Sequence, residues 1–162
     1  MVLVEGPTEE MLINAIMQSD DNHLNTIEVI AIGQKGFKTF MDVWLTVNSG
    51  NANRKLGIVR DFDNQSNARD EHDEYDASNN NIIVRTTVGY TLEDDLAAEG
   101  NNTAVLAEVF DLPDGSSADD VSNYMKNGKA EEMLKLCDAI IEEVHAVALP
   151  AHIREVIDFC HD

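Results

Sequence analysis

The alternation of short apolar runs with segments of helical periodicity is the feature that most constrains the fold. Four apolar runs have the composition of buried strands, and they cover residues 1–4, 26–33, 55–63 and 80–87. Apolar residues at helical spacing follow the first two runs, after Thr8 and over 36–47. Strands that alternate with helices predict a parallel sheet with right-handed crossovers. We therefore expect an α/β core.

The second half of the chain has a different texture. Four further segments with helical periodicity cover residues 103–110, 117–125, 129–149 and 151–160. We predict a core over residues 1–100 and a C-terminal helical extension, residues 101–162, packed on it. Residues 64–81 are polar and have no clear period, which predicts a loop in which His72 is solvated.

The charge balance limits what the chain can bind. It has 31 acidic and 11 basic residues and a net charge of −20. Such a surface repels nucleic-acid phosphates, so a nucleic-acid function would need bound cations, a basic partner or a small basic patch. No apolar run approaches the roughly 20 residues that span a bilayer, and no membrane association is expected. Cys137 and Cys160 lie far apart in the sequence, which favours reduced thiols and a cytoplasmic location.

Acidic residues follow three of the predicted strands. Glu5 follows the first strand and Glu9 comes one helical turn later, Asp61 and Asp63 follow the third strand, and Glu93 comes after the fourth. The carboxyl ends of parallel strands meet at one sheet edge, where ligands bind in open α/β sheets. Alternate residues of an extended segment point the same way, so we expect Asp61 and Asp63 to share a direction.

Carboxylates gathered in this way require a counter-charge. Two unit charges about 4 Å apart repel by about 4 kcal/mol at an effective dielectric constant of about 20. A hard cation such as Mg²⁺ or Mn²⁺ prefers oxygen ligands, and five acids are enough for two ions. Two ions together stabilise both oxygens of a phosphodiester displacement. An Asp-x-Asp pair alone is typical of a solvated turn, so the prediction depends on the clusters meeting.

The motifs LVEGPTEE and GIVRDFD resemble the Toprim domain of topoisomerases, DnaG-type primases and nucleases, and the similarity is greatest to the OLD (overcoming lysogenization defect) family. The matched positions are Glu5, Gly6, Thr8 and Glu9 in the opening motif, IGQKGFKTF in a glycine loop, Thr91, Leu92 and Glu93 in a Thr-Leu-Glu segment, and Lys129, Ala130 and Glu131 in a Lys-Ala-Glu segment. The resemblance implies a Toprim (Rossmann-like) core.

The resemblance also implies a function. It makes the chain the nuclease domain of an ATP-dependent endonuclease that cuts DNA with two metal ions. The implied metal ligands are Glu5, Glu9, Asp61, Asp63 and Glu93. Lys129 would stabilise charge on the phosphate, and Glu5, Asp61, Asp63 and Lys129 would form the catalytic set. OLD proteins also carry an ABC-type ATPase, and GQKGFKTF is not a phosphate-binding G-x-x-x-x-G-K-[ST] loop.

Alternatives remain open at this stage. The same ligands would serve a Toprim nuclease that acts on RNA. A non-catalytic module that docks to an ATPase partner through its acidic surface would explain the charge without any metal. The oligomeric state is open, with a homo-oligomer among the alternatives.

Overall fold

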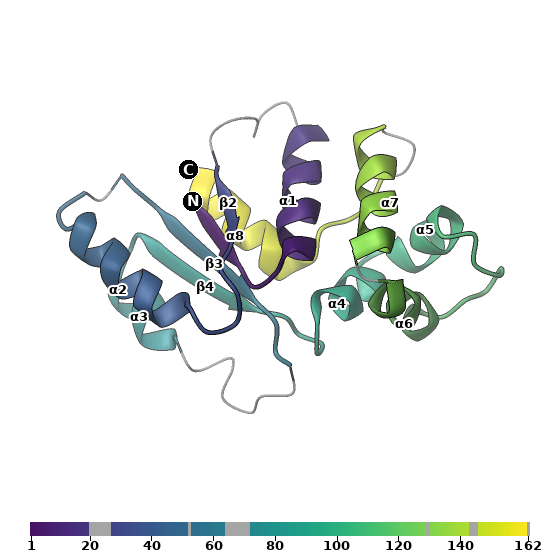
Figure 1. Cartoon of the computed structure of the whole chain (residues 1–162), viewed down its shortest axis with the longest axis horizontal. Coiled ribbons are helices and arrows are strands. Elements are labelled where there is room, and N and C mark those ends of the chain that lie inside the picture. Colours follow the sequence, from purple (N-terminus) through teal and green to yellow (C-terminus); the bar gives the residue numbers. More distant parts are fainter. Residues whose placement is uncertain (20–26, 52, 64–71, 129, 143–145, 162) are drawn as a thin grey trace.

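The computed structural model of the chain describes residues 1–19, 27–51, 53–63, 72–128, 130–142 and 146–161. Within these ranges a parallel sheet has the strand order β2-β1-β3-β4 (Figure 1). The strands are β1 (Val2–Val4), β2 (Val29–Ala31), β3 (Leu56–Arg60) and β4 (Ile82–Thr86). The predicted α/β class is confirmed.

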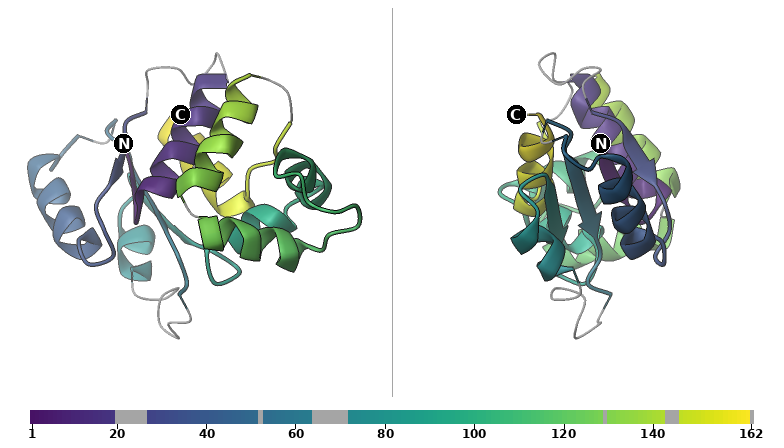
Figure 2. Two further views of the ribbon diagram at one scale, coloured as in Figure 1. Left: turned by 45° about the vertical axis from the view of Figure 1, so that its right-hand side comes forward. Right: turned by 90° about the vertical axis from the view of Figure 1, so that its left-hand side faces the viewer.

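The helices lie in two groups around this sheet. They are α1 (Pro7–Ser19), α2 (Phe37–Val47), α3 (Asp73–Ser78), α4 (Leu92–Ala98), α5 (Asn102–Val109), α6 (Ala118–Gly128), α7 (Ala130–Ile141) and α8 (Ala151–His161). Figure 2 shows α2 and α3 on one side of the sheet and α1, α7 and α8 on the other. The α4–α7 group makes up the helical part of the molecule beside the sheet (Figure 1).

Alternation along the strands accounts for the two layers. Leu3 packs in the cluster formed with α2, whereas Val2 and Val4 pack in the cluster that includes α1 and α8. In β3, Ile58 joins the first cluster and Val59 the second. Because successive strand residues point to opposite faces, an apolar run with no polar break is what a sheet covered on both faces needs.

The strand order reverses between β1 and β3. The chain passes from β1 outward to β2 and then returns across β1 to β3. The crossover helices α1 and α2 therefore cover opposite faces, and open α/β sheets bind ligands beyond the carboxyl ends of the strands at such a reversal. Glu5 and Asp61 are the residues that directly follow these strands.

Segments that are remote in the sequence complete the sheet's cover. Helix α8 packs on β3 and β4, and α7 packs along α1 (Figures 1 and 2). Helices from both halves of the chain thus pack directly on the sheet. The predicted boundary at residue 100, between a core and a helical extension, stays a prediction. None of the helices in the described ranges has the length and apolar character to cross a membrane.

The structure corrects the predicted loop over residues 64–81. Within its described part, α3 forms a short helix against β4, and Asp76 Oδ1 accepts a hydrogen bond from Val84 N at 3.0 Å. His72 is buried rather than solvated, because its ring lies against those of Phe37 and Tyr75. Tertiary contacts, which local polarity does not reveal, order this segment.

Gly57 sets the distance between β3 and α8. A Cβ atom at this position would lie 2.3 Å from Val156 Cγ1 and 2.9 Å from Cys160 Sγ. These distances are shorter than van der Waals contact, so the absence of a side chain lets the helix lie directly on the strand.

Substitution of Gly57 tests this close packing. We expect Gly57→Ala to lower the free energy of unfolding by about 1–3 kcal/mol, since the added methyl overpacks the interface. The cost should be smaller in a Val156→Ala background, in which the nearest atom is removed. Urea unfolding of the four chains measures both costs. Equal costs in the two backgrounds would contradict this account.

Candidate metal centre

Glu5 and Asp61 meet at the carboxyl ends of the two central strands. Asp61 N donates a hydrogen bond to Glu5 Oε1 at 3.2 Å, and Leu92 N donates to Asp61 Oδ1 at 2.9 Å. Arg60 Nε lies 3.7 Å from the same Glu5 oxygen, and both side chains are more than nine-tenths buried. The structure thus brings together two acids that are 56 residues apart in the sequence.

Glu9 is fixed over Gly6 at the start of α1. Its Oε2 accepts hydrogen bonds from Gly6 N and Thr8 Oγ1, each at 3.1 Å. A Cβ atom at Gly6 would lie 3.0 Å from this oxygen. Any larger residue at this position would therefore require the Glu9 carboxylate to shift. The Glu-Gly-x-Thr-Glu sequence thus forms a local hydrogen-bonded structure that holds the buried Glu9 at the sheet edge.

Asp63 reaches the site differently from the expectation. It has a left-handed backbone conformation, φ 49°, so the strand alternation that was expected to align it with Asp61 does not extend to it. Asp63 N donates to Tyr90 O at 2.9 Å, and Gln34 Nε2 donates to Asp63 Oδ2 at 3.0 Å. Aspartate tolerates this conformation better than most residues. The correction concerns its direction, and its carboxylate remains close enough to act on the charge of Asp61.

The acidic triplet 93–95 divides among separate contacts. Glu93 is buried in the first turn of α4 rather than directly after β4. Asp94 pairs with Lys126 and accepts a hydrogen bond from Ser122 Oγ at 2.6 Å. Asp95 accepts hydrogen bonds from backbone amides of the preceding loop. Within the triplet, only Glu93 is among the neighbours that perturb Asp61.

Asp61 carries the electrostatic strain of the cluster. Burial raises its pKa from the ordinary value of 3.8 to about 8, and the neighbouring carboxylates act in the same direction. These carboxylates belong to Glu9, Glu5, Glu93 and Asp63. Burial also raises the pKa of Glu5, although Arg60 opposes this shift. The five predicted ligands therefore form one electrostatic unit with excess negative charge.

The carboxylates of the described residues do not form a closed metal-binding cage. Over the described ranges, no group of three or more His, Cys, Asp or Glu side chains has the geometry to hold a metal ion. One oxygen of Glu5, of Glu9 and of Asp61 accepts a hydrogen bond from a backbone amide. Oxygen donors with uncompensated charge fit Mg²⁺ or Mn²⁺, which retain water ligands. Lys129 lies outside the described residues.

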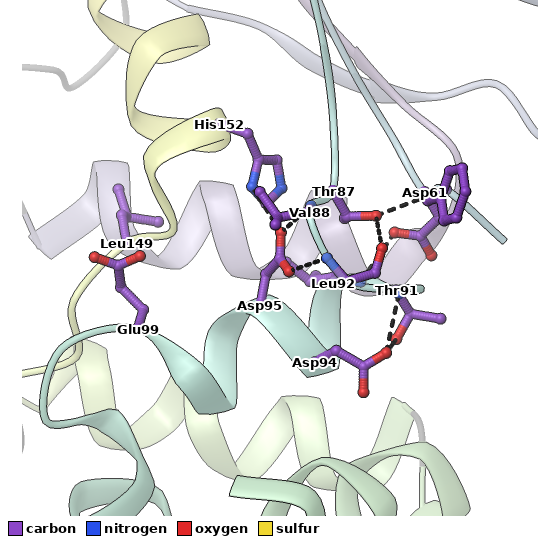
Figure 3. Close-up of polar contacts among 12 residues, drawn as sticks. Asp61, Thr87, Val88, Thr91, Leu92, Asp94, Asp95, Glu99, Leu149 and His152 are labelled. Atoms are coloured by element: carbon purple, nitrogen blue, oxygen red, sulfur yellow. Dashed lines mark hydrogen bonds and ion pairs between the residues drawn. The ribbon is translucent and has the colours of Figure 1, made fainter. Parts of the chain in front are cut away.

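Sequence reasoning missed a layer of supporting contacts behind the carboxylates. Asp95 accepts hydrogen bonds from Val88 N at 2.7 Å and Gly89 N at 2.6 Å, and its Oδ2 lies 3.2 Å from His152 Nδ1 (Figure 3). Thr87 Oγ1 accepts a hydrogen bond from Phe62 N at 2.9 Å. Helix α8 thus steadies the loop that leads to Glu93. No signal in one sequence pairs residues 95 and 152.

The sheet and its acidic edge resemble those of a Toprim domain. Residues 1–63 match the family model described as OLD-like_TOPRIM, the Toprim domain of proteins like the overcoming lysogenization defect protein. The match confirms the resemblance over this segment, which contains Glu5, Glu9, Asp61 and Asp63. Domains of this type are associated with nuclease, topoisomerase and primase activity and typically bind divalent metals. Comparison with curated proteins and with solved structures gives no match.

The raised pKa of Asp61 predicts that the free energy of unfolding of the metal-free chain falls as the pH rises. Between pH 3.8 and about 8 the folded state holds a proton that the unfolded state releases. Stability is therefore lost as pH rises, and the loss is complete only above pH 8. Urea unfolding with EDTA at pH 7 and pH 9 measures the last part of this loss. Asp61→Asn should reduce the loss.

A matched control separates this effect from general repulsion. Asp114→Asn removes one charge from the exposed turn between α5 and α6 and should keep the wild-type pH dependence. Burial lowers the pKa of His152 below 6.5, so its titration lies outside the measured interval from pH 7 to pH 9. The same pH dependence in Asp61→Asn and wild type would refute the assignment.

Proposed function

We propose that the chain is a divalent-metal-dependent DNA endonuclease, the nuclease domain of an OLD-type ATP-dependent endonuclease. The observation that supports this most is the joining of Glu5 and Asp61 by a 3.2 Å hydrogen bond at the reversal of strand order. Burial raises the pKa of Asp61 to about 8, and the charges of Glu5 and of three further carboxylates act in the same direction. Such a charge concentration is costly for a protein without a cation to bind.

The proposed ligands are Glu5, Glu9, Asp61, Asp63 and Glu93. Two Mg²⁺ or Mn²⁺ ions, when bound, would supply charge stabilisation for the attacking and leaving oxygens of a phosphodiester. The chain's own residues orient this edge: Gly6 N and Asp61 N hold one carboxylate oxygen each. Lys129 would offset negative charge on the phosphate. The reaction requires no serine or tyrosine nucleophile.

Partners follow from the same proposal. DNA must approach a chain with a net charge of −20, so bound cations and a basic surface on an ABC-type ATPase domain, in the same protein or a separate one, would provide attraction. We place the reaction in the cytoplasm, where Cys137 and Cys160, both free in the structure, would remain reduced. RNA stays as the alternative substrate.

A second candidate function has its own supporting observation. In the described ranges the acids do not form a closed metal-binding group, and the surface is strongly acidic. Both facts fit a non-catalytic module that docks to an ATPase. This candidate predicts that divalent cations have no specific effect on the fold, which separates it from the nuclease.

Removal of single charges tests catalysis. We expect Glu5→Gln and Asp61→Asn each to lower Mn²⁺-dependent nicking of supercoiled plasmid by roughly 100-fold or more, a loss typical of a missing charge-stabilising group. Both variants should stay folded, because each removes repulsion. Asp114→Asn should nick as wild type does. Nicking that survives either site variant would exclude the assignment, and cleavage of labelled RNA but not DNA would change the substrate.

Metal binding is tested without turnover. Mn²⁺ at about 100 times its dissociation constant should raise the free energy of unfolding by about 2.7 kcal/mol, since only the folded chain assembles the ligands. Thermal unfolding with Mn²⁺ and with EDTA measures the difference. The gain should vanish in Asp61→Asn and persist in Asp114→Asn. No gain in the wild-type chain would favour the docking module.

A further inference from the structure

An aromatic pair lies at the surface beside the candidate metal centre. Tyr90 is 55% exposed. Its ring stacks on that of Phe62, with centroids 6.2 Å apart and an interplanar angle of 28°. A half-exposed aromatic side chain offers a flat face for contact, and here a second ring packs against it.

The pair comes from the two segments that carry Asp61, Asp63 and Glu93. Phe62 stands between Asp61 and Asp63, and Tyr90 stands three residues before Glu93. The 2.9 Å hydrogen bond from Asp63 N to Tyr90 O joins the two segments. A molecule held on the Tyr90 ring would therefore lie next to the carboxylate edge.

The loop that carries Tyr90 is anchored on both sides. Asp95 accepts hydrogen bonds from Val88 N and Gly89 N, and Thr87 Oγ1 donates to Gly89 O at 3.1 Å (Figure 3). After Tyr90, Thr91 N donates to Asp94 Oδ2 at 3.2 Å. The backbone is thus fixed while the ring is exposed, so a ligand would pay little conformational entropy on binding.

Charge selects the kind of group that this surface can bind. The adjoining acids disfavour a bare phosphate, whereas a nucleobase is uncharged and presents a flat π-face. Tyr90 and the exposed Val88 also line a hollow of about 390 Å³. Its other lining residues include Ala98 and Ala118, with acids at Asp94, Asp95 and Asp119. A base has room there.

We propose that Tyr90, supported by Phe62, is a stacking platform for an unpaired base of a DNA strand whose neighbouring phosphodiester lies at the carboxylate edge. The inference rests on the proposed function. It supplies affinity that does not depend on positive charge, which the chain has little of. It also implies preference for a strand with an unpaired or displaced base, because a base inside a duplex has no free face to offer.

Binding of a labelled oligothymidine strand to the chain, followed by fluorescence anisotropy in Ca²⁺ to limit cleavage, tests the platform. Tyr90→Ala should weaken binding by roughly 5- to 150-fold, the range expected for loss of one base–aromatic stack. Tyr90→Phe should restore binding, since the ring carries the contact. The ratio of wild-type to Tyr90→Ala affinity should stay constant from 50 to 200 mM salt, unlike the loss of an ionic contact.

Control variants make each outcome decisive. Val47→Ala removes another exposed apolar side chain, 73% exposed on α2, and should bind as wild type does. Tyr90→Ala should keep the Mn²⁺-dependent gain in stability, which shows that the fold and metal ligands are intact. Wild-type binding by Tyr90→Ala, or equal losses in Tyr90→Ala and Tyr90→Phe, would overturn the platform alone. A wild-type chain that neither binds nor cleaves DNA would overturn the proposed function.

Discussion

Repulsion among buried carboxylates is the constraint on which this structure depends. The fold holds three of the acids at one sheet edge by giving each a main-chain donor: Asp61 N for Glu5, Gly6 N for Glu9 and Leu92 N for Asp61. Donors fixed by secondary structure keep the acids from turning out to water. The excess charge that remains can be neutralised by a proton on Asp61 or by a bound cation. The proposed function uses the cation.

The apolar core on both faces of the sheet stabilises the backbone against this repulsion. Leu3 and Ile58 pack toward α2, and Val4 and Val59 pack toward α1 and α8. Because both central strands are buried on both faces, their carboxyl ends are held in register within the parallel sheet. An edge strand would have more freedom to move apart under the same repulsion. The repulsion among the carboxylates thus acts where the backbone is most constrained.

Much of this organisation could be predicted from the sequence. The alternation of apolar runs predicted the parallel sheet, and the position of Glu5 and Asp61 after two strands predicted that they would meet. The direction of Asp63 could not be predicted, because it depends on a left-handed turn stabilised by Tyr90. The pairing of Asp95 with His152 was equally hidden, since it follows from the return of α8 to the sheet.

That return also governs the order in which the molecule can be completed. Helix α8 covers β3 and β4, yet it is made long after them, and the Cys160 thiol finally lies 3.5 Å from the Met1 carbonyl oxygen. A chain emerging from the ribosome must keep the apolar underside of these strands exposed until residues 151–161 have been synthesised. The contact between His152 and Asp95, which supports the loop before Glu93, can therefore form only after residues 151–161 have been synthesised.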